Sequence, residues 1–436
     1  MDPRVQYALG VLIGVGVDPV NVVCYGRENP SGRPVQIIPS GFFEEAYGAE
    51  ASLPALPLDE VEGVPLLFGE PAIQREGQTL VVRADVVASA YFLLTRYEEW
   101  VRRNVRDQHG RFPGRESLPY RAGFLDRPVV EEYGELLRKW SLEAGTSLPE
   151  PKRRFSVLPT HDVDFLKPIM KPLQPVRSVA KVLLGRQPWR KALRMAAFSL
   201  GIAPNPFDNL DHVLQMDRSI VENCSAARCQ PVCFFPVGGQ AVFDRSCDVG
   251  ETCVREAIQR VLTSGADVGL HASYEAGRRP ELVSAERRRL EEVAEVAIHK
   301  NRHHYLVWCE PEDGEAIAAA GIDWDATLGY AEVAGFRLGV CHPIALFDPM
   351  RRCLLGIEEH PLIVMDATLF EPAYMNLDEE AAFQHVRKLA DATFRHQGEF
   401  VMLWHNNVLA ATAPDYHLRL YPRVLRYLGQ LLESTE

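Results

Sequence analysis

After about residue 155, short apolar runs alternate with amphipathic helical patterns, and no other feature restricts the fold as strongly. Apolar runs of strand length separated by helical patterns are typical of βα units, which build parallel sheets. Roughly six or seven such units in about 280 residues predict a parallel barrel or an open doubly wound sheet, so the expected fold class is α/β. The predicted strands are 155–158, 232–237, 267–270, 303–308, 322–325, 338–341, 362–365 and 400–405.

Helical patterns are clearest at two places in this part of the chain. Between Leu290 and Ile298, apolar residues recur at the i, i+3, i+4, i+7 and i+8 spacing of one helix face. A last helix is predicted from Phe383 to Phe394, and Gly398 stops it. These helices supply the connections that parallel strands need.

The first 150 residues have a different character, because short apolar runs are mixed with many Pro and Gly residues. Helices are predicted near Asp85 and over 129–140, and the segment 149–154, with two prolines and a charge run, is predicted to be a linker. A chain of 436 residues is also too long for one ordinary core. We therefore expect a smaller N-terminal α+β domain over 1–150 and a larger domain over 151–436.

Composition excludes several classes of protein. A formal net charge of −12 argues against a broad nucleic-acid-binding surface, so no nucleic-acid partner is expected. Nine cysteines without a Cys-x-x-Cys motif indicate reduced thiols in a cytoplasmic protein. The apolar run 7–17 lacks a preceding basic cluster and a small-x-small cleavage pattern, and it is too short to span a bilayer. It is expected to be a buried helix or strand.

Ionisable residues directly follow several predicted strands: Asp162, Asp164, His271, Asp325 and His405. The carboxyl ends of parallel strands carry the active site in such folds, so these side chains are expected to meet on one rim. Asp162 and Asp164 are two residues apart and point to the same face of a regular strand. Two close carboxylates repel each other unless a cation separates them. A divalent metal held by one, with the other as base, resolves that conflict, and His271 offers a nitrogen ligand suited to zinc.

The sequence Thr160-His161-Asp162-Val163-Asp164 resembles the first motif of the polysaccharide deacetylase superfamily, in its branch with one residue between the aspartates. This resemblance implies that Asp162 is the catalytic base and that Asp164 binds the metal. Residues 269–274 are similar to the second motif, whose first histidine, here His271, is a metal ligand. Glu275 stands where the family has a second metal-binding histidine. Either Glu275 or His304 is therefore expected to be the third ligand.

The remaining motifs follow in the family's order, and the resemblance covers roughly residues 155–410. It implies that Arg302 orients the catalytic aspartate, that Asp325 belongs to the catalytic group, and that His405 is the general acid. The implied fold is a distorted (β/α) barrel, and the N-terminal part around residues 94–100 and 107–112 resembles the accessory domain that precedes some bacterial members. The side chains expected to bind substrate are Tyr274, Trp308, Trp404 and Asn406.

The function implied by the resemblance is metal-dependent removal of N-acetyl groups from a sugar or polysaccharide, with Zn²⁺ as the expected ion. Two alternatives remain open. The site could hydrolyse another amide C–N bond, or the chain could be a catalytically inactive sugar-binding or assembly protein. The missing second histidine favours the inactive protein, whereas the retention of Asp162, Asp164, His271 and His405 favours an enzyme.

A basic segment interrupts this acidic protein. Between Phe165 and Phe207 there are eight basic residues and no acidic one, with apolar residues interleaved. Basic amphipathic segments bind anionic membrane surfaces or phosphorylated ligands. Residues 167–194 are therefore interpreted either as a helical insertion that packs on the acidic body or as a peripheral contact with a membrane bearing a lipid-linked sugar.

Overall fold

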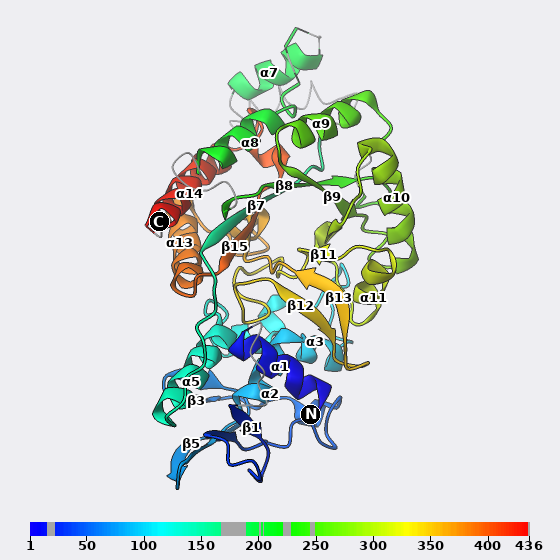
Figure 1. Cartoon of the computed structure of the whole chain (residues 1–436). Helices are drawn as coiled ribbons and strands as arrows, with labels where there is room; N and C mark the ends of the chain where they lie inside the picture. Colours follow the sequence, from blue (N-terminus) through cyan, green and yellow to red (C-terminus); the bar gives the residue numbers. More distant parts are fainter. Residues whose placement is uncertain are drawn as a thin grey trace. The chain divides into compact units, whose positions relative to one another are not determined.

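The computed structural model divides the chain into two compact units, each built from separate stretches of sequence (Figure 1). Unit 1 comprises Met1–Phe155, Tyr305–Asn376 and Lys388–Phe400, and unit 2 comprises Ser156–His304, Leu377–Arg387 and Val401–Glu436. The structure describes residues 1–14, 22–166, 189–199, 202–203, 205–220, 228–244 and 249–434. The prediction of separate domains over 1–150 and 151–436 stays a prediction.

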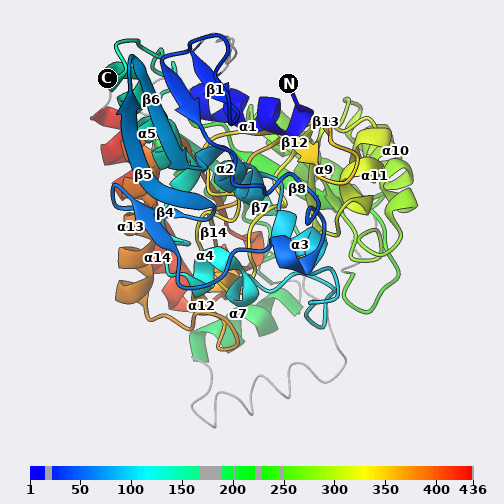
Figure 2. The same ribbon diagram turned by 90° about the horizontal axis from the view of Figure 1, so that it is seen from below.

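Unit 1 contains a four-stranded sheet in the order β1-β2-β6-β5, and three helices cover one of its faces (Figures 1 and 2). Strands β1, β2 and β6 are parallel, whereas β5 and β6 are antiparallel. All nine residues of α2 are buried, which explains why its sequence is apolar on every side. The elements are β1 (Val23–Tyr25), β2 (Val35–Ile37), β5 (Gly69–Glu76), β6 (Thr79–Ala84), α1 (Pro3–Ile13), α2 (Val86–Leu94) and α5 (Val129–Glu143).

The rest of unit 1 consists of short elements. Strands β3 and β4 form an antiparallel hairpin, and β13 pairs with β12 in antiparallel and with β11 in parallel orientation. The strands are β3 (Asp59–Val61), β4 (Val64–Leu66), β11 (Trp324–Asp325), β12 (Ile344–Asp348), β13 (Cys353–Glu359) and β14 (Val364–Met365). The helices are α3 (Tyr97–Val101), α4 (Leu118–Arg121), α11 (Glu312–Ala319) and α12 (Asp366–Phe370), with 3₁₀ turns at Glu50–Ser52 and Gly114–Glu116.

Unit 2 contains the strands β10-β9-β8-β7 and most of β15, which are neighbours in that order; the first two residues of β15 belong to unit 1. Neighbouring strands from β7 to β10 are parallel, and their helical connections lie outside them in Figure 1. The strands are β7 (Ser156–Asp162), β8 (Val232–Pro236), β9 (Asp267–Ala272), β10 (Lys300–His303) and β15 (Glu399–Leu403). The helices are α7 (Trp189–Ser199), α8 (Leu210–Ser219), α9 (Thr252–Thr263), α10 (Val283–Ala294) and α14 (Asp415–Glu433), with 3₁₀ turns at Pro280–Leu282 and Asn406–Leu409. The helix α13 (Glu379–Arg395) and the 3₁₀ turn His304–Leu306 begin in unit 2 and end in unit 1.

Three local predictions are wrong. Residues 303–308 form no strand beyond His303, because Tyr305 and Leu306 have φ values of 62° and 54° that break the extended backbone. Residues 338–341 are buried but do not form a strand, because Gly339 has a φ of +68° that breaks the extended backbone. A β-carbon at Gly339 would lie 3.0 Å from Leu93 Cδ1, so this close approach also favours glycine. The helix predicted through Ile298 ends at Ala294, because Glu295 adopts the left-handed conformation, with a φ of 58°.

A buried triad, His161, Asp217 and Tyr421, ties β7 to the elements around it. His161 Nδ1 donates to the carbonyl oxygen of Trp404 at 2.8 Å, and Nε2 donates to Asp217 Oδ2 at 2.8 Å. The Tyr421 hydroxyl donates to the other Asp217 oxygen. Because both ring nitrogens of His161 face oxygen acceptors, the imidazole carries two protons and a positive charge. Burial alone lowers its pKa, but the charge and hydrogen bond of Asp217 raise the pKa of His161 above its usual value.

We predict that Asp217→Asn lowers the free energy of unfolding by about 3–5 kcal/mol at pH 6, because it leaves the buried imidazolium without its counter-charge. A raised histidine pKa stabilises the fold fully below its unfolded value near 6.5, and this stabilisation is lost as pH rises through the folded pKa. The difference in unfolding free energy between the wild type and Asp217→Asn should therefore be smaller at pH 9 than at pH 6. Urea unfolding at both pH values measures it, with Tyr421→Phe as a control that keeps both charges. Equal stability of Asp217→Asn and the wild type at pH 6 would contradict the assignment.

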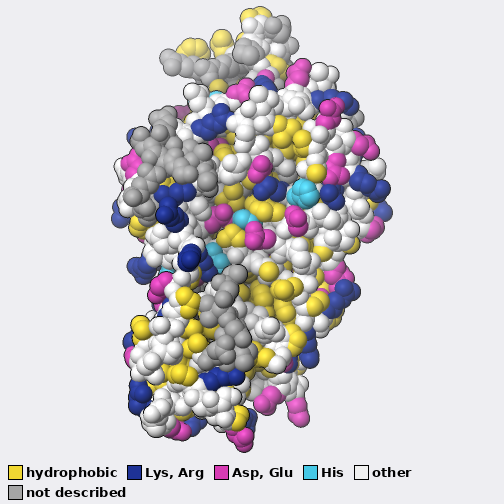
Figure 3. Space-filling model, viewed as in Figure 1, with side chains coloured by type: hydrophobic (Ala, Val, Ile, Leu, Met, Phe, Trp, Pro, Cys, Tyr) yellow, Lys and Arg dark blue, Asp and Glu magenta, His cyan; other side chains and the backbone are white. Residues whose placement is uncertain are grey.

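The fold class is mixed α/β, as predicted, while the distorted barrel and the N-terminal accessory domain stay predictions. None of the described helices is long and apolar enough to cross a membrane. On the face shown in Figure 3, acidic and basic side chains are interspersed. Residues 167–188 of the basic segment 167–194 lie outside the described residues. The predicted membrane contact of this segment therefore stays a prediction.

Candidate metal centre

The candidate site forms where neighbouring strands of unit 2 end. Asp162 is the last residue of β7, and Asp164 follows two residues later. His271 lies on β9 directly opposite Arg302 of β10, and His304 begins the turn after β10. Because these strands are parallel, their carboxyl ends bring the four side chains of the aspartates and histidines to one edge of the sheet. All four are buried.

Asp164, His271 and His304 form a group whose potential ligand atoms all lie within 4.8 Å of one another. His271 Nε2 is 3.5 Å from Asp164 Oδ1, and His304 Nε2 is 3.6 Å from Asp164 Oδ2. His271 Nδ1 donates its proton to the carbonyl oxygen of Arg302 at 2.9 Å, which leaves the lone pair of Nε2 directed into the group.

Two atoms of this group indicate a cation. Within the described part of the chain, Asp164 Oδ1 and His271 Nε2 are buried without a hydrogen-bond partner. A carboxylate oxygen and an imidazole lone pair repel each other at this distance, and buried polar atoms are rarely left unpaired. One carboxylate and two imidazoles are a donor set that suits Zn²⁺ and similar divalent ions. The residues therefore fit a bound metal.

Without an ion, protons balance part of the negative charge in this group. Burial alone would raise the pKa of Asp164, but a hydrogen bond from His304 and the charges of His304, His271 and His405 lower it below its usual value. Burial lowers the pKa of His271. Burial opposes the charged form of His304 as well, but hydrogen bonds with Asp164 and Asp244 raise its pKa to about 9. Binding of a metal at this group must displace the proton of His304.

Asp162 lies beside this group without belonging to it. One of its oxygens is 3.5 Å from His271 Nε2 and 4.0 Å from His405 Nε2, and the other is 3.4 Å from Arg302 Nη1. Arg302 also donates to Thr160 Oγ1 at 2.5 Å, and its guanidinium lies over the ring of Phe234. The predicted base, its orienting arginine and the predicted acid are therefore within reach of one another.

The structure distinguishes between the two candidates for the third ligand. His304 belongs to the group, whereas Glu275 is engaged elsewhere. One oxygen of Glu275 accepts the backbone N–H of Gln240 at 2.8 Å, and the other is 3.2 Å from Arg279 Nη1. The geometry therefore favours His304, although the sequence left both residues open.

Three of the residues expected to bind substrate are buried in unit 2. The Tyr274 hydroxyl accepts a hydrogen bond from Arg278 at 3.0 Å. Trp404 packs against Tyr421 with 5.1 Å between ring centroids. Asn406 Nδ2 donates to the carbonyl oxygen of Phe165. These contacts stabilise the loops around the site, and the substrate-binding roles of Tyr274, Trp404 and Asn406 stay predictions.

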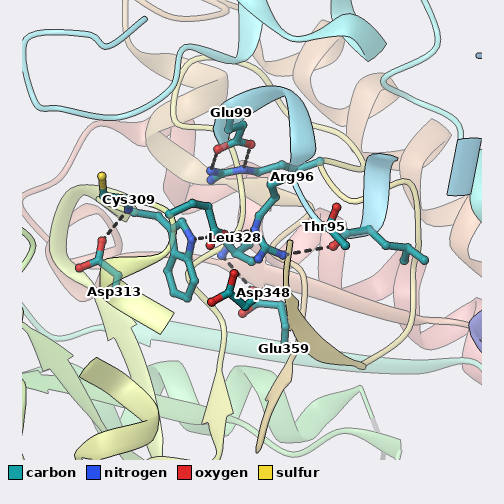
Figure 4. Close-up of polar contacts among 12 residues, drawn as sticks. Thr95, Arg96, Glu99, Cys309, Asp313, Leu328, Asp348 and Glu359 are labelled. Carbon is teal, nitrogen blue, oxygen red and sulfur yellow. Dashed lines mark hydrogen bonds and ion pairs between the residues drawn. The ribbon is translucent and has the colours of Figure 1, made fainter. Parts of the chain in front are cut away.

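Trp308 and Asp325 lie in unit 1. Figure 4 shows polar contacts around Arg96 in the same unit. Trp308 Nε1 donates to Glu310 at 2.7 Å, and Glu310 forms an ion pair with Arg96. Asp325 Oδ1 accepts the backbone N–H of Thr327 at 2.8 Å. Both side chains are buried, and their predicted roles in binding and catalysis stay predictions.

Two acidic residues near the site have no counterpart in the sequence predictions. Asp244 follows β8 after a loop, and its Oδ1 is 3.8 Å from His304 Nδ1. A search for polar residues shortly after each predicted strand could have found it. Asp217, the partner of His161, lies in the last turn of α8 and gave no signal, because an aspartate on a helix is usually exposed.

Parts of the chain are similar to a family of known sequences and to solved structures. Residues 17–144 match a protein family described as a family of unknown function (DUF7033). No curated protein matches the chain. The chain is similar to the solved structure of a "putative polysaccharide deacetylase" from Mycobacterium smegmatis, with 14% identity, a TM-score of 0.39, and coverage of 65% of this chain and 90% of that one. It is also similar to the polysaccharide deacetylase Bc1974 from Bacillus cereus, with 10% identity, a TM-score of 0.29, and coverage of 64% and 88%.

We predict that purified protein binds one divalent ion and that Asp164→Ala and His304→Ala each lower Zn²⁺ affinity strongly. Loss of a ligand should cost more than the roughly 10–100-fold that loss of a ligand's supporting partner costs. Glu275→Gln serves as the matched control and should bind Zn²⁺ like the wild type. Zinc content after dialysis and competition with a chromophoric chelator measure the effect. If Glu275→Gln lost the metal while His304→Ala retained it, the assignment of the third ligand would be wrong.

Proposed function

We propose that this chain is a metal-dependent amide hydrolase that removes acetyl groups from an N-acetylated carbohydrate. The observation that carries the proposal is the position of Asp162, a buried carboxylate beside the Asp164, His271 and His304 group. A carboxylate next to a metal group but outside it is placed to act as a base. The motif around Thr160–Asp164 supports the choice of an N-acetylated sugar as the substrate class.

Asp164, His271 and His304 would hold the ion, and we propose Zn²⁺ because the donors are two imidazole nitrogens and one carboxylate oxygen. The bound ion would supply polarisation of the acetyl carbonyl and a lowered pKa for water in the site. The protein supplies the remaining functions through groups that it holds rigidly in a buried environment. A low local dielectric strengthens the interactions of these charges.

Asp162 takes the proton from the attacking water in this scheme. Arg302 Nη1 lies 3.4 Å from Asp162 Oδ1, and the same guanidinium nitrogen donates to Thr160 Oγ1. The arginine therefore keeps one carboxylate oxygen in place and leaves the other, Oδ2, directed toward His271 and His405. This orientation leaves Oδ2 available to accept a proton beside the metal group.

His405 returns a proton to the departing nitrogen. Its Nε2 lies 4.0 Å from Asp162 Oδ2, so the proposed acid and base flank the same small space. The C–N bond breaks as water oxygen becomes bonded to the carbonyl carbon, and the products are acetate and a free amine. The departing nitrogen receives its proton from His405, and Asp162 holds the proton taken from water. Transfer of a proton from Asp162 to His405 through solvent then restores the enzyme.

We predict that Asp162→Asn lowers acetate release by roughly 10²–10⁴-fold, the usual contribution of a general base, while zinc content stays that of the wild type. Asparagine keeps the size and the hydrogen bond from Arg302 but cannot accept the proton. Acetate release from a panel of N-acetylated mono- and oligosaccharides measures activity, and metal analysis of the same samples measures zinc. Retention of full activity by Asp162→Asn would contradict the mechanism.

The same experiment separates the alternatives. Zinc binding without acetate release from any sugar, together with release of another amine from a different amide, would indicate a hydrolase of another C–N bond. Absence of metal from the wild type would favour a sugar-binding or assembly protein. Glu286→Gln, at a buried carboxylate outside this mechanism, provides a control for nonspecific losses of activity.

A further inference from the structure

We infer that Asp244 is a positioning residue that holds His304 in the orientation required for metal binding. This inference rests on the proposed metal site. His304 lies between two carboxylates, with Nε2 3.6 Å from Asp164 and Nδ1 3.8 Å from Asp244. A proton on Nδ1, facing Asp244, leaves the lone pair of Nε2 free to face the other ligands. Metal-binding histidines are commonly supported by such a carboxylate on the second ring nitrogen.

The surrounding backbone fixes the carboxylate of Asp244. Its Oδ1 accepts the N–H of Tyr274 at 2.6 Å, and its Oδ2 accepts the N–H of Ala241 at 3.0 Å. The side chain is only 3% exposed. A carboxylate held by two backbone donors cannot turn away from His304 without losing both hydrogen bonds. Asp244 therefore presents a fixed negative charge to the imidazole.

A glycine makes room for this carboxylate. Gly239 has a φ of +88°, and a β-carbon there would lie 2.1 Å from Asp244 Oδ2. Any other residue would both strain the backbone and displace the carboxylate. The position of Asp244 thus explains the glycine at position 239.

The placement of Asp244 connects three of the strands that form the site. The loop after β8 carries it, Tyr274 follows the His271 strand, and His304 follows β10. His304 arrives from a strand other than that of His271, and Glu275 occupies the position of the second histidine in the resembling motif. A ligand supplied from a separate strand needs its own support, and Asp244 provides it.

The test compares Zn²⁺ affinity in the full-length wild type, Asp244→Asn, His304→Ala and the double variant. The wild type should bind zinc, and Asp244→Asn should bind it roughly 10–100-fold more weakly, as expected for loss of a ligand's supporting carboxylate. In the His304→Ala background, Asp244→Asn should have no further effect, because the group that Asp244 positions is gone.

Glu286→Gln is the matched control. Glu286 is a buried carboxylate that accepts hydrogen bonds from the N–H and hydroxyl of Ser273, next to the segment that contacts Asp244. Its hydrogen bonds within the described part of the chain are to Ser273 and not to His304. Its variant should bind Zn²⁺ like the wild type. Circular dichroism and urea unfolding of each variant identify any loss of folded protein.

Three results would overturn the inference. Asp244→Asn with wild-type affinity would show that the carboxylate does not position His304. An equal loss in Glu286→Gln, or in the His304→Ala background, would show that Asp244 acts on the fold alone. Absence of zinc binding by the wild type would overturn the proposed metal site and this inference with it. Zinc binding by the wild type without a loss in Asp244→Asn would overturn this inference alone.

Discussion

The site depends on one electrostatic constraint: two buried, electron-rich atoms face each other without a proton between them. Asp164 Oδ1 and His271 Nε2 are 3.5 Å apart, and neither has a hydrogen-bond partner among the described residues. The proton of His271 is committed to the carbonyl oxygen of Arg302. A cation satisfies both atoms at once, so the arrangement of the surrounding strands is most simply explained by metal binding.

The strands keep these atoms together through contacts on both sides of the aspartate motif. Thr160 Oγ1 donates to the carbonyl oxygen of Met402, and His161 Nδ1 donates to that of Trp404. The first contact connects β7 to β15, and the second connects β7 to the residue that follows β15. Both lie immediately before Asp162 and His405, the proposed base and acid. The buried His161–Asp217 pair is costly to desolvate, and it orients the imidazole whose Nδ1 donates to Trp404.

Much of the site could be predicted from the sequence, because strand ends in parallel sheets are marked by polar residues after apolar runs. This rule correctly located Asp162, Asp164 and His271 at the ends of β7 and β9. It could not choose between Glu275 and His304, because both carry suitable donor atoms. Only the folded chain shows that Glu275 is bound to the backbone of Gln240. Tertiary partners such as Asp217 and Asp244 leave no periodic signal, and buried loops such as 338–341 have the apolar composition of strands.

The central claim is that Asp164, His271 and His304 bind one divalent ion beside Asp162. The most direct test is a crystal structure of the protein grown with Zn²⁺, with diffraction data collected on both sides of the zinc absorption edge. The account predicts an anomalous peak about 2.0–2.2 Å from Asp164 and from the Nε2 atoms of His271 and His304, the usual distances for zinc ligands. No peak at this group, or a peak coordinated by Glu275 in place of His304, would contradict it.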